Sequence, residues 1–473
     1  MNPISLANHA VRIHNEFNYS RDPSYKFHSD YFSDYLKSHF LKNLSQLNKY
    51  DALKCAMTIS STTAFIDWKL LPDIDSGCVA VIESSIAPLN EITRALGVSK
   101  KNIKNIEKKL KKILFLTQMD LLANNGAALV VRDVVTNFKN HVEPYATDIE
   151  LSVGSFRAAP ISKCVASSLN LGSSRITLQY FTALDAVSKY IELYKPDLVI
   201  FDYFLAPLTM LPYTSPEPFY AYFSHGFVPL ILDNVDAILV HGGVVGEKTR
   251  GAMQELSPYH FNSTVMLPMA GAGCRRIDLG QTDNEGALIA AMASARVSGK
   301  KIAVTMCRRE KISRQFIDFL EAGLDARQDL FVVCAGPGVE KCRGLISSDR
   351  ALFVGGVTPE LILENADIYI ETFPEHQGLS AIDAMRAGVP VLCLNNDENR
   401  HLLLSRRPAS GVARSIQGLL NILSSINNDH LVCGRILSEQ ADILSGLAEE
   451  EARFWPTIFD QLTGGNGTRG ALR

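Results

Sequence analysis

Two acidic residues, Glu375 and Asp383, stand eight positions apart on either side of the turn Gly378-Leu379-Ser380. The surrounding stretch, ADIYIETFPEHQGLSAIDAMRAGVPVLCL, predicts a buried strand, a glycine-bearing loop, a short helix and a second buried strand. One carboxylate would then lie at a loop tip and the other in the first turns of a helix. The acids can accept hydrogen bonds from sugar hydroxyls, while backbone N–H groups at the start of the helix can bind a diphosphate.

A loop with three cations, Arg308, Arg309 and Lys311, follows the predicted strand KKIAVTM. Ligands of parallel α/β sheets bind beyond the carboxyl ends of the strands, so position and sign of charge both favour a diphosphate here. The cations could also stabilise the charge that develops on a departing nucleotide diphosphate. A solvated basic loop is the alternative interpretation.

The loop GGVTPE follows another predicted strand, ALFVGGV. Thr358 suits a helix N-cap, and Pro359 suits the first helical position. Gly355 and Gly356 allow a ligand to approach the backbone closely. We expect the backbone around Val357 and Thr358 to bind a flat base, and an ordinary strand-to-helix turn is the alternative.

Strand-like and helix-like segments alternate along most of the chain, and the strands are continuous apolar runs. This pattern predicts an α/β fold with two Rossmann-like domains, each built on a doubly wound parallel sheet, and a helical region in front of them. We place the helical accessory region at 1–108 and the first Rossmann-like domain at 109–280. The second Rossmann-like domain is placed at 281–462, and a flexible tail at 463–473.

Composition narrows the class of protein. At 473 residues the chain is too long for one ordinary core, and a net charge of -3 gives no global reason to expect a nucleic-acid partner. The nine cysteines form no CxxC pair and no Cys/His cluster with zinc spacing, which favours a reducing cytoplasm. The first residues lack a secretory pattern, and no apolar run approaches the roughly 20 residues of a membrane span.

A lysine-rich segment between Lys100 and Lys112 could bring the protein to an anionic lipid surface or an acidic acceptor. A solvated helix face is the more common role of such a segment. We therefore expect a cytoplasmic protein for which peripheral membrane contact stays open.

The segment from Lys301 to Leu394 resembles the carboxy-terminal domain of GT-B glycosyltransferases. The large family with acids eight apart shows the pattern E-x-F-G-L-x-x-L-E-A-M-A-x-G-x-P-V, which is matched here by Glu375, Gly378-Leu379, Asp383, Ala384-Met385, Gly388 and Pro390-Val391. The second acid is Asp rather than Glu, and His376-Gln377 replaces the usual pair. With ETFP before it, the stretch is also similar to the O-GlcNAc transferase and bacterial N-glycosyltransferase group. That group inverts and many members of the first family retain, so the stereochemistry stays open.

The resemblance extends more weakly to the first Rossmann-like domain, which it implies is the acceptor domain. Gly126 stands where these enzymes have a glycine-rich loop near the donor phosphates. His225 stands at their His-Gly position, where it would contact the donor hexose or act as general base. His241, Asp202 and Tyr203 also follow predicted strands and could meet an acceptor, although a structural role is the alternative for each.

The sequence thus predicts a metal-independent hexosyltransferase without a cofactor. Its donor would be a nucleotide diphosphate sugar, with a UDP-sugar favoured, and its acceptor a saccharide, a lipid-linked sugar or a protein. One alternative is a UDP-N-acetylglucosamine 2-epimerase on the same fold, because VTMCRREK is similar to that family's T-x-H-R-R-E-N stretch. The other is a non-catalytic protein that binds a sugar nucleotide or a partner.

Overall fold

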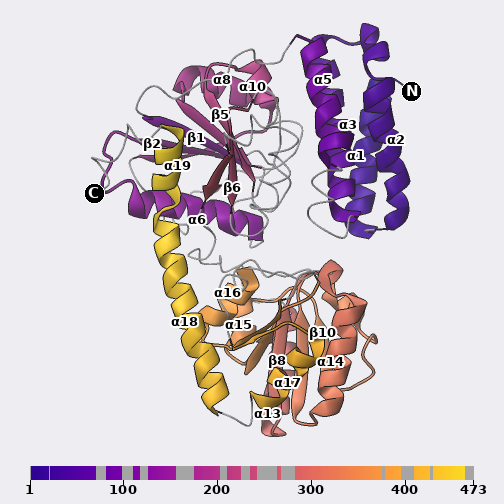
Figure 1. Cartoon of the computed structure of the whole chain (residues 1–473), viewed down its shortest axis with the longest axis vertical. Helices are drawn as coiled ribbons and strands as arrows, with labels where there is room; N and C mark the ends of the chain where they lie inside the picture. The colour runs from indigo at the N-terminus through magenta and orange to yellow at the C-terminus, as the bar shows by residue number, and fades with distance from the viewer. Residues whose placement is uncertain are drawn as a thin grey trace. The chain divides into compact units, whose positions relative to one another are not determined.

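The computed structural model describes residues 2–20, 22–70, 81–97, 110–117, 126–155, 175–202, 210–224, 235–241, 264–267, 283–374, 379–395, 410–426 and 430–463. The chain divides into two compact units (Figure 1). Unit 1 contains residues 1–277 and 451–473, and unit 2 contains residues 278–450. The functional roles that the sequence assigns to the domains stay predictions. None of the helices in the described ranges is long and apolar enough to cross a membrane.

Unit 1 begins with the predicted helical region. Its helices are α1 (Pro3–Ser20), α2 (Lys26–Ser38), α3 (Lys49–Leu70) and α5 (Ala87–Ala95), with a π-helical turn at Ile82–Ile86 before α5. They lie side by side in Figure 1, and α3 contacts α1 and α2. Leu6, Ala10, Ile13 and Phe17 recur at helical spacing in α1 and are all buried. The helices therefore form because each presents one apolar face to its neighbours.

The sheet of unit 1 has seven parallel strands in the order β3-β2-β1-β4-β5-β6-β7. The strands are β1 (Lys112–Thr117), β2 (Glu150–Ser155), β3 (Ile176–Tyr180), β4 (Leu198–Asp202), β5 (Phe219–Ser224), β6 (Ala237–His241) and β7 (Thr264–Leu267). The helices α6 (Gly126–His141), α8 (Leu184–Tyr194) and α10 (Leu211–Thr214) connect some of these strands. The two edge strands of this sheet, β3 and β7, were not predicted from the sequence.

The helix α19 (Phe454–Leu462) belongs to unit 1 although it follows unit 2 in the sequence. It contacts α6 and β7. The indole Nε1 of Trp455 donates to the carbonyl oxygen of Val134 at 2.8 Å, and the Trp455 ring packs edge-on against Phe138. Since Trp455 is fully buried, this late segment is part of the core of the first sheet.

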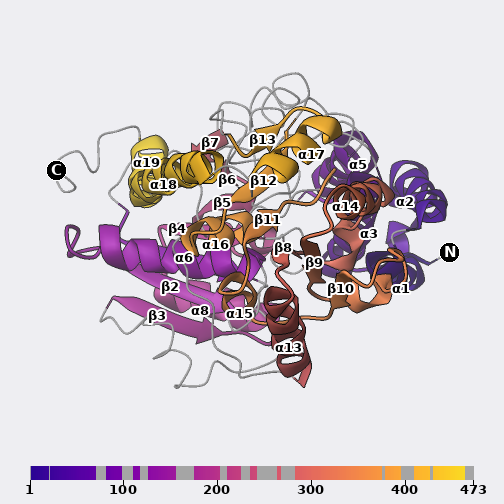
Figure 2. The same ribbon diagram turned by 90° about the horizontal axis from the view of Figure 1, so that it is seen from below.

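The sheet of unit 2 has six parallel strands in the order β10-β9-β8-β11-β12-β13 (Figure 2). The strands are β8 (Lys301–Met306), β9 (Leu330–Ala335), β10 (Ala351–Val354), β11 (Ile368–Ile370), β12 (Val391–Leu394) and β13 (Val412–Ala413). The helices are α13 (Asp283–Val297), α14 (Arg314–Ala326), α15 (Pro359–Leu363), α16 (Leu379–Arg386), α17 (Ile416–Ser425) and α18 (His430–Ala452). Two parallel sheets confirm the predicted α/β architecture.

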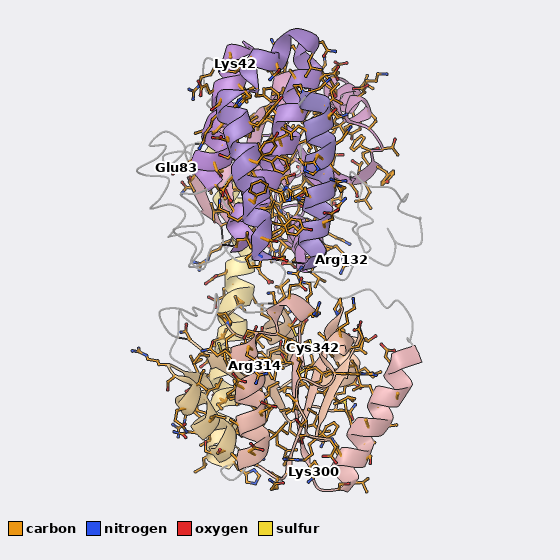
Figure 3. All side chains as sticks on the ribbon, turned by 90° about the vertical axis from the view of Figure 1, so that its right-hand side faces the viewer. Lys42, Glu83, Arg132, Lys300, Arg314 and Cys342 are labelled. Atoms are coloured by element: carbon orange, nitrogen blue, oxygen red, sulfur yellow. The ribbon has the colours of Figure 1, made fainter. Side chains whose placement is uncertain are left out.

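The central strands of unit 2 are almost wholly buried because helices cover the sheet. On one face, the apolar sides of α14 and α17 pack with residues of β9 and β12 in a single core cluster. In Figure 3, Lys300 marks the amino end of β8, whereas Arg314 and Cys342 lie toward the opposite end of the strands. That opposite, carboxyl edge carries the residues considered next.

Candidate functional site

The strand order of unit 2 creates a natural place for a ligand. β8 and β11 are neighbours in the middle of the sheet, and the chain leaves β8 toward β9 but leaves β11 toward β12. At such a switch point the two loops diverge and leave a crevice beyond the carboxyl ends of the strands. The cationic loop 307–311 follows β8, and the segment that begins at Glu371 follows β11. The cationic loop and the described residues 371–374 therefore reach the same point.

The three predicted cations have different surroundings. Arg308 is exposed and forms an ion pair with Glu310, with Nη1 3.2 Å from Oε1. Arg309 is also exposed, and burial raises the pKa of the Cys342 thiol while the nearby Arg309 guanidinium opposes this rise. Lys311 is half-buried. A neighbouring carboxylate thus partly neutralises Arg308, and all three cations belong to the loop that follows β8.

A glycine after β9 fixes the backbone of the cationic loop. Gly336 has a φ of +141°, and a Cβ atom there would lie 1.8 Å from the carbonyl oxygen of Cys307. The Gly336 N–H donates to the carbonyl oxygen of Gly355 at 3.0 Å, and the Arg309 N–H donates to that of Pro337 at 3.1 Å. The loops after β8, β9 and β10 are therefore in direct contact, and only glycine fits at their centre.

A serine joins the cationic loop to the segment after β11. Ser313 is the N-cap of α14, and its hydroxyl accepts the N–H of Phe316 at 3.0 Å. The same hydroxyl donates to the carbonyl oxygen of Phe373 at 2.7 Å. The buried Phe373 ring packs edge-on against Phe316 and Phe319 of α14. One side chain thus caps a helix and holds together the two sides of the switch point.

A buried acid lies under the switch point, and the sequence analysis assigned it no role. Glu371 follows β11 directly and is fully buried. Burial raises the pKa of the Cys307 thiol to about 12, the Glu371 carboxylate adds to this rise, and the Lys311 ammonium opposes it. Glu371 and Lys311 are therefore both within electrostatic reach of one thiol. The signal in the sequence was an acid at the end of the apolar run IYI, where buried charge is rare.

The predicted donor residues of α16 also lie at this edge. Leu379 and Ser380 are the first two residues of the helix and are half-buried, as is Asp383. Burial raises the pKa of Tyr369, and the carboxylates of Glu371 and Asp383 contribute in the same direction. Asp383 is therefore within electrostatic reach of a tyrosine on β11. Glu375 and Gly378 lie outside the described residues.

The loop after β10 is bound by Glu285 of α13, a residue to which the sequence assigned no role. The N–H and the hydroxyl of Thr358 both donate to Oε1 of Glu285, at 2.8 and 2.7 Å. Thr358 is the N-cap of α15, but its hydroxyl makes no capping bond to that helix. Val357 and Thr358 are half-buried, and Gly356 is exposed.

Unit 1 has its own switch point, between β1 and β4. The Thr117 hydroxyl at the end of β1 donates to Oδ2 of Asp202 at the end of β4, over 2.7 Å. Both side chains are fully buried, and Ser155 and Ser224 end the neighbouring strands β2 and β5 with buried hydroxyls. Polar residues thus line the carboxyl edge of an otherwise apolar sheet.

The other residues predicted in unit 1 are only partly described. Gly126 is the first residue of α6, directly after the β1–α6 connection, and His241 is the last residue of β6. His225 and Tyr203 lie outside the described residues, as does the lysine-rich segment up to residue 109. Within the described ranges, no group of three His, Cys, Asp or Glu side chains could hold a metal ion.

Comparison with solved structures identifies the architecture. A mutant of the O-GlcNAc transferase of Thermobaculum terrenum superposes with a TM-score of 0.56 at 12% identity, covering 98% of this chain and 99% of its own. A glycosyltransferase of Rickettsia africae gives 0.52 at 11% identity, covering 75% and 99%. HepE of Anabaena, in complex with UDP and glucose, gives 0.51 at 14% identity, covering 74% and 99%.

The chain has a GT-B glycosyltransferase fold. This confirms the fold that the resemblance implied, for unit 1 as well as for the segment that carried the motif. The match to the Thermobaculum protein spans nearly the whole chain, whereas the other two leave about a quarter of it uncovered. No protein-family model matches the sequence, and no curated protein sequence matches it.

Proposed function

We propose that this protein is a glycosyltransferase that moves a hexose from a nucleotide diphosphate donor, with a UDP-sugar favoured, to a saccharide, lipid-linked or protein acceptor. One observation carries the proposal. The cationic loop and the acid-bearing helix α16 converge on the switch point of the sheet in unit 2, on a GT-B fold. HepE, which shares this fold, is seen with UDP and glucose, the class of ligand proposed here.

The donor would bind to three parts of this edge. Arg309 and Lys311 would bind the diphosphate, and N–H groups near Gly378, Leu379 and Ser380 would add to them. Asp383 and Glu375 would accept hydrogen bonds from ribose or sugar hydroxyls. The base would lie against the backbone of Val357 and Thr358. No metal ion is assigned a role, since two cationic side chains already offset the charge of the phosphates.

In the transfer step, the bond between the anomeric carbon and the diphosphate oxygen breaks while a bond to the acceptor oxygen forms. The diphosphate leaves with the bonding electron pair, and Arg309 and Lys311 would stabilise its added negative charge. The acceptor hydroxyl must lose its proton to a base. His225 is the candidate that the sequence favours.

The first test is a panel of UDP- and GDP-sugars, in which binding and slow hydrolysis are measured for the wild type and for Arg309→Ala. Losing a charge-assisted contact of about 1.5–3 kcal/mol should weaken donor binding by roughly tenfold to a hundredfold. The matched control is Arg296→Ala, because Arg296 pairs with Asp367 before β11, at the amino end of the same sheet. Glu375→Ala tests the acid of the motif in the same assay.

Each outcome separates the candidate functions. Release of UDP from one sugar nucleotide, lost in Arg309→Ala but kept in Arg296→Ala, supports a transferase and names its donor. Conversion of UDP-N-acetylglucosamine to its 2-epimer would replace the transferase with the epimerase alternative. Nucleotide binding without any turnover would favour the non-catalytic alternative, and no binding at all would contradict the proposed donor site.

A further inference from the structure

The buried carboxylate of Glu285 has an unusual partner. Glu285 lies in the first turn of α13 and is only 1% exposed. Its Oε1 accepts two hydrogen bonds from a single residue, the N–H and the hydroxyl of Thr358. Burying a carboxylate costs free energy that only well-placed donors can offset. The two hydrogen bonds from Thr358 offset part of that cost.

Thr358 binds Glu285 instead of capping the helix that it precedes. A threonine at an N-cap usually accepts the N–H of the second or third helical residue, which satisfies one donor of the helix end. Here the hydroxyl makes no such bond to α15 and donates to Glu285 instead. The loop after β10 is thus tied to α13, although a local cap was chemically available.

The loop after β10 has a second contact, at Gly355, and an exposed residue, Gly356, between the two contacts. The carbonyl oxygen of Gly355 accepts the N–H of Gly336 at 3.0 Å, which links it to the loop after β9. Between these two contacts, a Cβ atom added at Gly356 would meet no atom of the described residues within 4 Å. The loop therefore presents a fixed stretch of backbone at the carboxyl edge of the sheet.

We propose that Glu285 is a positioning residue for the nucleotide: by holding Thr358, it fixes the backbone from Gly355 to Val357 on which the base lies. This inference rests on the proposed donor site. A loop held in its binding conformation loses less freedom when the ligand binds, so the tie raises affinity without touching the ligand. Because the N–H of Thr358 is committed to Glu285, a backbone N–H that binds the base would have to come from a residue before Thr358.

The test compares two ligands that share a diphosphate but differ in the base. Affinity for UDP and for inorganic pyrophosphate is measured by calorimetry, with the unfolding temperature recorded for each variant. Glu285→Ala should weaken UDP binding about tenfold and leave pyrophosphate binding unchanged, because pyrophosphate would contact the cationic loop and the start of α16 but not the loop after β10. Arg309→Ala should weaken both ligands. Glu285→Gln should stay within about threefold of the wild type, since an amide oxygen can accept both bonds from Thr358.

A second pair of variants keeps the inference testable if Glu285→Ala does not fold. Thr358→Val removes the hydroxyl donor and should weaken UDP binding about threefold, whereas Thr358→Ser keeps the donor and should match the wild type. A lower unfolding temperature with unchanged UDP affinity in both Glu285→Ala and Thr358→Val would overturn the inference and leave Glu285 a purely structural acid. If the wild type bound pyrophosphate but not UDP, or bound neither, the donor site itself would be wrong.

Discussion

The carboxyl edges of the two sheets differ in how their residues are held. In unit 2, backbone contacts among successive loops fix the edge: Gly336 touches Cys307 and binds Gly355, and Ser313 reaches Phe373. In unit 1, buried side chains at the strand ends bind one another, as Thr117 binds Asp202. Both sheets are parallel, but their carboxyl edges differ. The edge of unit 2 consists of charged and glycine-rich loops, whereas buried hydroxyls and the Asp202 carboxylate lie at the edge of unit 1.

The difference indicates what each edge is suited to do. Fixed backbone with cations suits a ligand of constant shape and charge, such as a nucleotide diphosphate. A fully buried acid that is bonded to a hydroxyl instead holds two strand ends together. The following four experiments test this contrast, beginning with the largest expected effect.

Gly336→Ala should destabilise unit 2 by about 3 kcal/mol or more, because its Cβ would overlap the Cys307 carbonyl oxygen and its φ of +141° is unfavourable for alanine. Denaturant unfolding followed by circular dichroism measures the change. Gly356→Ala is the matched control, because a Cβ there meets no described atom within 4 Å, and it should change stability by less than about 0.5 kcal/mol. Equal stability of the two variants would show that the loops after β8 and β9 are not packed as described.

Thr117→Val should destabilise unit 1 by about 2 kcal/mol, because the buried Asp202 carboxylate loses a charged hydrogen bond of 2.7 Å. Thr117→Ser keeps the hydroxyl and should lose much less. UDP affinity should be the same in both variants, since the proposed donor site belongs to unit 2. A weaker UDP affinity in Thr117→Val would mean that the two edges do not act on separate ligands.

Ser313→Ala should cost about 1 kcal/mol of stability through the lost N-cap of α14 and should also weaken UDP binding severalfold, because Phe373 is released. Ser415→Ala is a matched control: Ser415 caps α17 by accepting the N–H of Gly418 at 3.1 Å. Its loss should lower stability by a similar amount but leave UDP affinity unchanged. If both variants kept full affinity, the link across the switch point would have no part in binding.

The smallest effect concerns the thiols. Burial and the Glu371 carboxylate raise the pKa of Cys307 to about 12, so at pH 8 it stays protonated and unreactive. Alkylation with iodoacetamide, followed by mass spectrometry, should modify the half-buried Cys433 well before Cys307. Because the folded pKa exceeds the unfolded value of 9.0, Cys307 stabilises the fold below pH 9, and this contribution is lost as the pH rises toward 12. Rapid labelling of Cys307 in native protein would contradict its burial.

The sequence was sufficient to predict most of the fold because the central strands are continuous apolar runs. Strands such as β1, β4 and β8 are buried on both faces, so most of their residues are apolar. The edge strands β3 and β7 of the first sheet and β13 of the second were not predicted. An edge strand has one neighbour and is less buried, and β3 accordingly carries polar residues at several positions.

The candidate site could be predicted only where its chemistry is local in sequence. The cations after β8 and the acid of α16 stand in short motifs, and the structure brings their elements to one switch point. Glu285 and Thr358 are 73 residues apart, and Thr117 and Asp202 are 85 apart, so no local pattern connects them. Gly336 could have been suspected from the Gly-Pro-Gly run after β9, but its contact with Cys307 depends on the pairing of strands.

The burial of Trp455 has a consequence for the order in which the protein can be completed. A growing chain leaves the ribosome from its amino end, and domains usually fold as units while they emerge. All the strands of the first sheet appear before residue 268, yet the helix that holds Val134 and covers Phe138 appears only after all of unit 2. Unit 1 therefore begins to fold first but is completed last. Until α19 has been synthesised, the apolar surface around Phe138 stays uncovered.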